Sequence, residues 1–286
     1  MNRRLLGYFL ALFLPSAALI AGAGAVLYRA QAAKLREVVQ LRLSIDTEHG
    51  AAELRKLVID YAQDVRFIRA LPTMQAAIDN PSPASVAALE RLFVAAATSK
   101  REIDRVRWID ETGRERVRVS VIAGRAVAIA PEQLQAKHDR YFVRDIEHLE
   151  AGQLYVSPMD LSVDQGAIEL PHKPVLRVGT PLFDASGRRH GMLIVNYRTA
   201  GFLTVLDDTA KEIPRIPMLL NGRGDWLHGP TGVDAWGFMF GRRDNFANRH
   251  PEVWTRIVAA GDGQFQDAAG IWTFATVRPQ SLVAPT

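Results

Sequence analysis

The sequence predicts an α+β fold that is preceded by an apolar helix. Three observations carry this prediction. About two dozen uncharged residues run from Leu5 to Tyr28, and residues 29–71 lack proline and repeat apolar residues at helical spacing. From residue 100 the apolar period changes from 3.6 to 2 residues. Helix and strand patterns then alternate with glycine turns, which is typical of antiparallel sheets covered by helices.

The uncharged stretch from Leu5 to Tyr28 is long enough to cross a membrane. At 1.5 Å per residue, a helix of this length spans the ~30 Å hydrocarbon core of a bilayer. Arg3 and Arg4 precede it and favour a cytoplasmic N-terminus, with the remainder on the far side. Small residues at 21–25 also fit a cleaved signal peptide, although the apolar region of such a peptide is shorter. We expect residues 1–29 to form a cytoplasmic tip and a single-pass anchor.

Residues 30–71 are predicted to form one long stalk helix. Apolar residues recur at helical spacing, first in a stripe of four and then in a second stripe: Leu35, Val38, Leu41 and Ile45, then Leu54, Leu57, Val58, Tyr61, Val65 and Ile68. The helix either packs along its own domain or pairs with a second copy, and both arrangements can hold over different lengths. The second arrangement predicts a homodimer.

Residues 72–199 are predicted to form a module with an antiparallel sheet. Prolines at 72, 81 and 83 separate short helices, the second of which covers residues 85–99. Pro131 is expected to begin a further helix that continues to about Glu150. Apolar residues at period 2 predict strands at residues 103–110, 115–122, 154–161, 175–183 and 191–197.

A shorter version of the same pattern predicts a second module over residues 200–278. It comprises a helix, a proline-containing linker, two short strands, another helix and a hairpin, at residues 200–211, 213–217, 218–220, 226–228, 250–260 and 263–277. A strand, a glycine turn and a returning strand thus recur, which fits two stacked sheet modules with helices on their faces. Residues 279–286 form a tail.

Composition restricts the function classes. The chain has 286 residues, a net charge of +4 and no cysteine. A disulfide scaffold, a thiol nucleophile and cysteine-ligated zinc are therefore excluded. The positive charge is spread along the chain and forms no tail, so we expect no nucleic-acid binding.

Catalytic motifs are missing from the sequence. Its seven histidines show no HExxH or comparable ligand spacing, and neither Gly-x-Ser-x-Gly nor a phosphate-binding glycine loop occurs. We therefore expect a chain that is not an enzyme and that holds no metal or cofactor. An anchored hydrolase and a partner-binding protein without a small-molecule pocket remain the alternatives from other classes.

Arginines alternate with apolar residues on two neighbouring predicted strands. Arg105 and Arg107 share one face of the first strand, and Arg116 and Arg118 share one face of the second. If several of them converge on a concave site, their paired N–H donors suit a carboxylate or a phosphate. The alternative is a solvated sheet face that binds nothing.

Several segments, in this order, resemble a known family. They are Arg107-Trp108-Ile109-Asp110-Glu111-Thr112-Gly113, Asp139-Arg140-Tyr141-Phe142, Tyr155-Val156-Ser157-Pro158-Met159-Asp160, Pro174-Val175-Leu176-Arg177 and the apolar strand after Gly191. Together they resemble the double Cache, or tandem PAS-like, extracytoplasmic sensor domains of bacterial histidine kinases, diguanylate cyclases and chemoreceptors. The resemblance covers about residues 30–278.

This resemblance implies both an architecture and a function. It implies two stacked PAS-like modules on the long helix, with a small-molecule ligand in the membrane-distal module. The chain would be the periplasmic sensor region of a signal-transduction receptor in the bacterial inner membrane. Receptors of this family carry a second membrane span and an output module, and residues after Val277 resemble neither. We therefore expect either a truncated receptor or an anchored binding protein.

The resemblance also indicates site residues. Arg140 and Arg177 belong to segments that cover or border the sheet, and acidic residues in the region of Asp160 pair with a ligand ammonium in related sensors. The predicted ligand-binding residues are Arg107, Arg118, Arg140, Tyr141, Tyr155, Asp160 and Arg177. Asp160 as a turn cap and Tyr155 as a core residue are the alternatives.

The sequence departs from the amino-acid-binding subgroup of the family. That subgroup has an Arg, a spacer and then Trp-Tyr, whereas Arg140-Tyr141-Phe142 has neither the spacer nor the Trp. The departure argues against an amino acid as the ligand, and the arginines suit a small molecule with a carboxylate.

Overall fold

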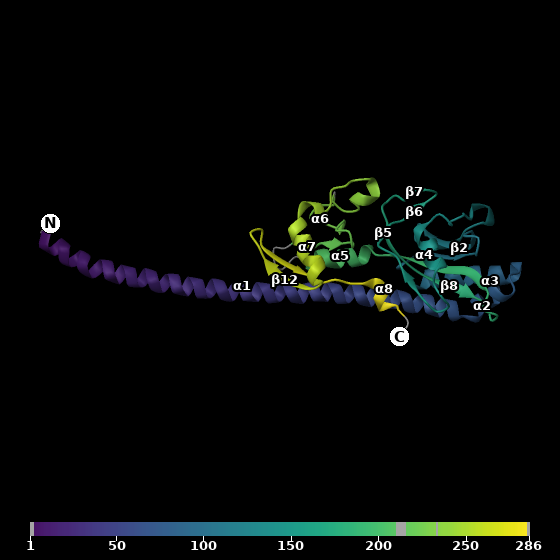
Figure 1. The fold of residues 1–286 in the computed structure, drawn as a ribbon, viewed down its shortest axis with the longest axis horizontal. Helices are drawn as coiled ribbons and strands as arrows, with labels where there is room; N and C mark the ends of the chain where they lie inside the picture. Colours follow the sequence, from purple (N-terminus) through teal and green to yellow (C-terminus); the bar gives the residue numbers. More distant parts are fainter. Residues whose placement is uncertain (1–2, 210–215, 233, 285–286) are drawn as a thin grey trace. The chain divides into compact units, whose positions relative to one another are not determined.

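The computed structural model describes residues 3–209, 216–232 and 234–284 (Figure 1). The chain divides into two compact units. The first consists of Met1–His49 and Asp262–Ala275, and the second consists of Gly50–Gly261 and Thr276–Thr286. Helices and antiparallel sheets make up both, which confirms the predicted α+β class.

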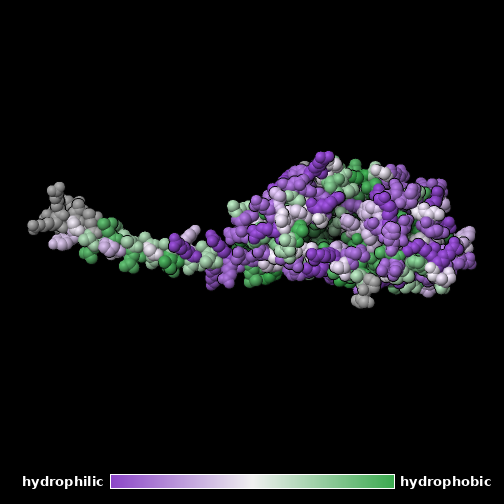
Figure 2. Space-filling view, in the orientation of Figure 1, coloured by the Kyte–Doolittle hydropathy of each residue, from purple (hydrophilic) through white to green (hydrophobic). Residues whose placement is uncertain are grey.

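A single helix, α1 (Arg3–Ala70), contains both the predicted anchor and the predicted stalk. It continues through Pro15, as membrane helices can where the freed backbone groups are satisfied locally. Between Gly7 and Ala70 it contains a stretch that is apolar and long enough to cross a membrane. Figure 2 shows hydrophobic residues along its N-terminal part.

In the first unit a hairpin lies on α1. Strands β12 (Gly263–Gln266) and β13 (Ile271–Phe274) pair antiparallel, as the sequence predicts. The Gln264 side chain donates to the carbonyl of Gln40 at 3.0 Å and so attaches the hairpin to the helix.

The second unit is built around a seven-stranded antiparallel sheet with the order β3-β2-β1-β9-β8-β4, in which β5 also pairs with β8. Its strands are β1 (Ile103–Ile109), β2 (Glu115–Ile122), β3 (Arg125–Ala128), β4 (Tyr155–Val156), β5 (Asp160–Leu161), β8 (Pro174–Phe183) and β9 (Arg189–Arg198). The turn between β1 and β2 requires glycine, because a Cβ on Gly113 (φ +78°) would lie 2.7 Å from the Cβ of His138.

One face of this sheet forms the main apolar core. The C-terminal part of α1 packs there together with α2 (Pro72–Asp79) and α3 (Pro83–Ser99) (Figure 1). Every second residue of the central strands faces these helices and is buried, among them Val106, Val119 and Val195. The rings of Tyr61 and Tyr197 stack at 3.7 Å and join α1 to β9.

The covering segment after β3 differs from the prediction. A continuous helix from Pro131 to Glu150 is wrong, since only η1 (Pro131–Gln133) and α4 (Tyr141–Glu147) are helical. Between them the backbone pairs with the first hairpin: the N–H of Glu115 donates to the carbonyl of Gln135, and the N–H of Lys137 donates to that of Gly113. These bonds replace the ones that a helix would make.

The segment between α4 and β8 also contains more turns than expected. The predicted strand 154–161 is divided into β4 and β5. An additional hairpin follows, formed by β6 (Val163–Asp164) and β7 (Ala167–Ile168), which constitutes a two-stranded sheet of its own. The sequence analysis did not predict this hairpin, because strands of two residues show no apolar period.

The remaining elements of the second unit are α5 (Ala200–Thr209), β10 (Leu219–Leu220), β11 (Trp226–His228), η2 (Gly237–Phe240), α6 (Phe246–Arg249), α7 (Pro251–Ala260) and α8 (Pro279–Leu282). They include the predicted helices and short strands α5, β10, β11 and α7, together with η2, α6 and α8, which were not predicted; α8 lies within the predicted tail. The predicted end of α5 at residue 211 and most of the linker 213–217 lie outside the described residues. The division into modules 72–199 and 200–278 stays a prediction.

Candidate ligand-binding site

The face of the sheet opposite α1, α2 and α3 carries buried guanidinium groups. Arg107 on β1 pairs in register with Arg118 on β2, and Asn196 on β9 lies between Arg105 on β1 and Arg177 on β8. The four arginine side chains are only 2–5% exposed. This face of the sheet therefore carries a row of arginines that are buried inside the domain.

A β-bulge decides which charged residues of β2 face this interior. The register shifts between Trp108 and Ile109, so that Glu115 lies opposite Ile109. Glu115 consequently points toward Arg118, whereas Arg116 is exposed and its guanidinium carbon lies 6.0 Å from the Trp108 ring centroid. The prediction that Arg116 and Arg118 share one face is therefore wrong.

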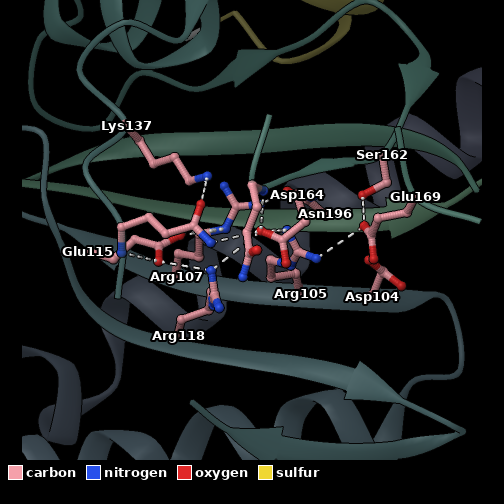
Figure 3. Close-up of polar contacts among 12 residues, drawn as sticks. Asp104, Arg105, Arg107, Glu115, Arg118, Lys137, Ser162, Asp164, Glu169 and Asn196 are labelled. Carbon is pink, nitrogen blue, oxygen red and sulfur yellow. Dashed lines mark hydrogen bonds and ion pairs between the residues drawn. The ribbon is translucent and has the colours of Figure 1, made fainter. Parts of the chain in front are cut away.

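Seven charged residues form what we call the buried charge cluster (Figure 3): Arg105, Arg107, Glu115, Arg118, Lys137, Asp164 and Glu169. At its base, Glu115 is fully buried and lies 3.2 Å from Arg118 Nη1 and 3.5 Å from Arg107 Nε. The backbone N–H of Gln135 donates to the same carboxylate at 3.0 Å.

The cluster is strongly electropositive around Arg107. Burial, together with the nearby charge of Arg105, lowers the pKa of Arg107 to about 9. Burial and the charge of Arg107 likewise lower the pKa of Lys137 to about 8. Because an additional negative charge would oppose both shifts, the site favours an anion.

The β6–β7 hairpin covers the arginines with two carboxylates. The Asp164 carboxylate lies 3.7 Å from Arg118 Nη1 and 3.9 Å from Arg105 Nη1, and Glu169 Oε2 lies 3.1 Å from Arg105 Nη2. Burial alone would raise the pKa of Asp164, but Arg105, a hydrogen bond from Gln135 and Arg118 outweigh it and hold the pKa below its ordinary value. Both carboxylates are thus held ionised.

Several buried donors of the cluster are not satisfied by the covering groups. Within the part of the chain that the structure describes, Nε and Nη1 of both Arg105 and Arg107, and Nε of Arg118, have no hydrogen-bond partner. A buried unsatisfied donor costs about 1–3 kcal/mol. Such donors are the groups that a bound anion would satisfy.

A second polar group lies beside this cluster. Arg177 Nη1 is 2.6 Å from Asp160 Oδ1, and the Tyr141 hydroxyl donates to Asp160 Oδ2 at 2.8 Å and accepts from Arg177 at 3.1 Å. We call these three residues the Arg177 group. Burial would lower the pKa of Arg177, but Asp160 and Tyr141 outweigh it and raise that pKa above its ordinary value. Both oxygens of Asp160 are therefore engaged within the protein.

Phe142 on α4 connects the two polar groups. The guanidinium carbons of Arg177, Arg140 and Arg107 lie 5.1, 5.7 and 5.8 Å from its ring centroid. Helix α4 comes this close to the sheet because β8 has Gly179 beneath it, where a Cβ would lie 2.4 Å from Ile146 Cδ1. The face of the Phe142 ring thus attracts the guanidinium groups of these three arginines.

Comparison with known proteins identifies the family. The model of the bacterial histidine kinase sensor domain matches residues 48–282. The chain belongs to this family. Comparison with curated protein sequences finds no match.

Solved structures similar to the sensor domain are sensory domains as well. The extracellular domain of vpHK1S-Z8, described as a histidine kinase, is 20% identical with a TM-score of 0.70, covering 85% of this chain and 86% of that chain. A domain of a sensory box/GGDEF family protein from Vibrio parahaemolyticus is 19% identical with a TM-score of 0.69, covering 85% and 93%. The ligand-binding domain of Campylobacter jejuni chemoreceptor Tlp3, in complex with L-norvaline, is 9% identical with a TM-score of 0.56, covering 83% and 85%. The chain therefore shares the fold of these sensory domains, and the family match assigns residues 48–282 to a sensor domain.

The predicted site residues of the sensor domain occupy neighbouring positions on one face of the sheet. Arg107 and Arg118 belong to the buried charge cluster, while Tyr141, Asp160 and Arg177 form the Arg177 group. Arg140 lies against Phe142, and the Tyr155 hydroxyl donates to Asp145 at 2.8 Å. Their role in ligand binding stays a prediction.

Sequence reasoning missed half of the sensor domain's candidate site. Glu115, Lys137, Asp164, Glu169 and Phe142 were not predicted, although all contact or lie near the arginines. The adjacency of Phe142 to the predicted Arg140-Tyr141 pair was the one available signal, since the others lie on a bulge or on irregular segments.

A hollow of the sensor domain lies elsewhere, on α3. It has a volume of about 550 Å³ and is lined by residues of α3 and by Ala128 of β3. We place more weight on the arginine face, because a specific site needs convergent polar groups and this hollow is mainly apolar. Among the described residues, no group of three or more acidic or histidine side chains could hold a metal ion.

Proposed function

We propose that this sensor domain binds a small molecule with a carboxylate on the arginine face of its seven-stranded sheet. The ligand lies between the sheet and the segments that cover it, and Arg107, Arg118 and Arg177 bind its anionic group. Arg140, Tyr141, Tyr155 and Asp160 complete the surroundings. The L-norvaline complex of the Campylobacter jejuni receptor domain supports a small-molecule ligand, and the departure from the amino-acid pattern argues against an amino group.

A single observation carries this proposal. The Arg107 side chain is 3% exposed and is the member of the buried charge cluster that also contacts the Phe142 ring. Its Nε and Nη1 have no hydrogen-bond partner among the described residues. A guanidinium buried in this way is costly unless an anion completes its environment. Carboxylates fit because they accept two parallel N–H bonds from one guanidinium.

The test is a thermal-shift screen of organic acids on the full chain in nanodiscs, followed by calorimetric titration of any acid that stabilises it. Arg107→Gln should weaken binding of that acid about 10- to 100-fold, as expected for a lost charged hydrogen bond. Arg116→Gln is the matched control, because Arg116 is exposed at the bulge of the neighbouring strand. Unchanged affinity in Arg107→Gln would show that the arginine face is not the site.

Arg140→Ala should have a smaller effect, about threefold to tenfold on the same affinity, since Arg140 lies over the Phe142 ring, 5.7 Å from its centroid, and not within the buried charge cluster. If the affinity for the acid does not change in this variant, Arg140 does not belong to the site.

We further propose that the chain is anchored by residues 5–28 in the bacterial inner membrane, with the sensor domain in the periplasm. The apolar N-terminal part of α1 and the two preceding arginines support this orientation. A phosphatase reporter fused after Thr286 should be active, because such an enzyme requires the periplasm for folding. An inactive reporter with normal expression would contradict the orientation.

The receptor is proposed to act as a homodimer through α1. Leu35, Val38, Leu41 and Ile45 are 54–65% exposed on the helix, at a spacing that suits a helix–helix contact. Because the chain has no cysteine, Leu41→Cys in membranes gives a clean test by oxidative cross-linking. Arg36→Cys, about 140° around the helix, is the control. Equal cross-linking of both variants would contradict a specific interface.

A further inference from the structure

The β6–β7 hairpin is held over the sheet largely by charge. Each of its strands has two residues, and they pair with each other rather than with the main sheet. Ile168 is its apolar contribution to the neighbouring core. Its other attachments are polar: the ion pairs of Asp164 and Glu169 with arginines, an ion pair of Glu169 with Lys173 at 3.0 Å, and hydrogen bonds from Gln135 to Asp164 at 3.0 Å and from Ser162 to Glu169. A segment with so few apolar contacts can open at low cost.

The two hairpin carboxylates occupy the positions that a ligand's carboxylates would take. Asp164 and Glu169 are 28% and 20% exposed, whereas the side chains of Arg105 and Arg118 beneath them are 4% and 5% exposed. Access to these arginines from solvent therefore leads past the two carboxylates. Arg105 contacts both of them, and Arg118 contacts one (Figure 3).

The charge balance of the cluster indicates how much charge a ligand must bring. Five cations, Arg105, Arg107, Arg118, Lys137 and Lys173, face four carboxylates, Asp104, Glu115, Asp164 and Glu169, which leaves one positive charge in excess. If the hairpin lifts and removes Asp164 and Glu169, three positive charges remain in excess over Asp104 and Glu115. An anion with two negative charges restores the original balance.

We propose that the β6–β7 hairpin is a displaceable internal ligand, and that an external dicarboxylate replaces Asp164 and Glu169 on Arg105 and Arg118 as the hairpin lifts. This proposal rests on the proposed function and names the ligand class of the same site. The carboxylates of Asp164 and Glu169 are two separate groups, and a ligand with two separate carboxylates replaces them better than a single phosphate does. An ammonium group on the ligand has no role here, because Asp160 is engaged by Arg177 and Tyr141.

The exchange also couples ligand binding to a change in the conformation of the hairpin. A ligand shifts an equilibrium only by its differential affinity for the two states. With the hairpin closed the dicarboxylate has no access to the arginines, and with the hairpin open it can satisfy nitrogens of Arg105 and Arg107 that the hairpin leaves without hydrogen bonds. Binding and opening are therefore the same event.

The first experiment removes the internal competitor. Asp164→Asn/Glu169→Gln in the full chain in nanodiscs is titrated with malonate, succinate and glutarate, and with butyrate and inorganic phosphate for comparison. The dicarboxylate that fits best should bind the double variant at least tenfold more tightly than the wild type. Glu132→Gln is the matched control, because it removes an exposed carboxylate of the covering segment that contacts no arginine.

The outcomes distinguish this inference from the proposed function. Equal or weaker dicarboxylate affinity in the double variant overturns the displaceable hairpin. Tighter binding of butyrate or phosphate than of every dicarboxylate overturns the ligand class. In both cases a loss of affinity in Arg107→Gln would leave the proposed site standing. If none of these anions binds the wild type or the double variant, the dicarboxylate proposal is wrong.

A second measurement needs no variant. Hydrogen–deuterium exchange of the wild-type chain should become faster at residues 163–169 when the dicarboxylate is saturating, while the strands of the main sheet become more protected. Slower exchange of the hairpin on binding would mean that the ligand closes it, which contradicts displacement.

Discussion

Both faces of the seven-stranded sheet are buried and carry apolar residues, but only one of them also buries arginines. Val106, Val119 and Val195 on one face pack against helices, and Arg105, Arg107, Arg118 and Arg177 on the other lie beneath irregular segments. The apolar face is complete without any further molecule. The arginine face retains buried donors without hydrogen-bond partners among the described residues, in addition to its ion pairs, and burial of those donors opposes folding.

The difference between the two faces indicates that stability depends mainly on one face and ligand binding on the other. Burial of apolar side chains stabilises the folded state and places few demands on geometry. A buried ion-pair network contributes little net stability, because desolvation of its charges offsets their attraction. Substitutions on the apolar face should therefore lower stability and spare ligand binding, whereas substitutions on the arginine face should spare stability and abolish binding. Three predictions test this contrast.

The largest expected effect is on the apolar face. Phe93 on α3 is fully buried against the sheet, so Phe93→Ala should lower the free energy of unfolding by about 3–5 kcal/mol. Denaturant titration of the full chain measures it. Binding of a carboxylate to the molecules that remain folded should keep its wild-type affinity. A stability loss below 1 kcal/mol would mean that this face is not the main core.

On the arginine face the effect on stability should be small or reversed. Arg107→Met replaces a buried cation, whose pKa burial lowers to about 9, by an apolar side chain of similar length. The free energy of unfolding should stay unchanged or rise by about 1 kcal/mol, because the desolvation cost of one cation is removed while the Glu115 carboxylate keeps Arg118 at 3.2 Å and the N–H of Gln135 at 3.0 Å. Carboxylate binding should be lost in the same variant. A destabilisation as large as that of Phe93→Ala would remove the distinction between the faces.

The smallest effect concerns pH. Burial and the charge of Arg107 lower the pKa of Lys137 from 10.5 to about 8, so the unfolded chain binds more protons than the folded one between these values. The free energy of unfolding should therefore rise with pH from about 8 to about 10. In Lys137→Met the free energy of unfolding should rise less over this pH range than it does in the wild type. Parallel pH profiles of the two proteins would show that Lys137 is not held among the cations of the cluster.

Much of this arrangement could be predicted from the sequence. The positions of α1, β1, β2, β8 and β9 agree with the prediction to within a few residues, because long apolar periods and glycine turns specify them locally. Alternation also placed Arg105 and Arg107 on one face of β1. The family resemblance added Arg177 and Asp160, which lie 2.6 Å apart in the structure.

The sequence by itself thus determined which residues share a face in the regular part of a strand, such as Arg105 and Arg107 on β1, since that follows from the period of the backbone. Whether the arginine face lies in solvent or in the interior was decided by the tertiary structure alone. The segments that cover it, residues 134–140 and the β6–β7 hairpin, have no apolar period and are held by contacts to strands distant in the sequence. The bulge at Trp108/Ile109 likewise turned Glu115 inward and Arg116 outward, a change that only strand pairing can impose.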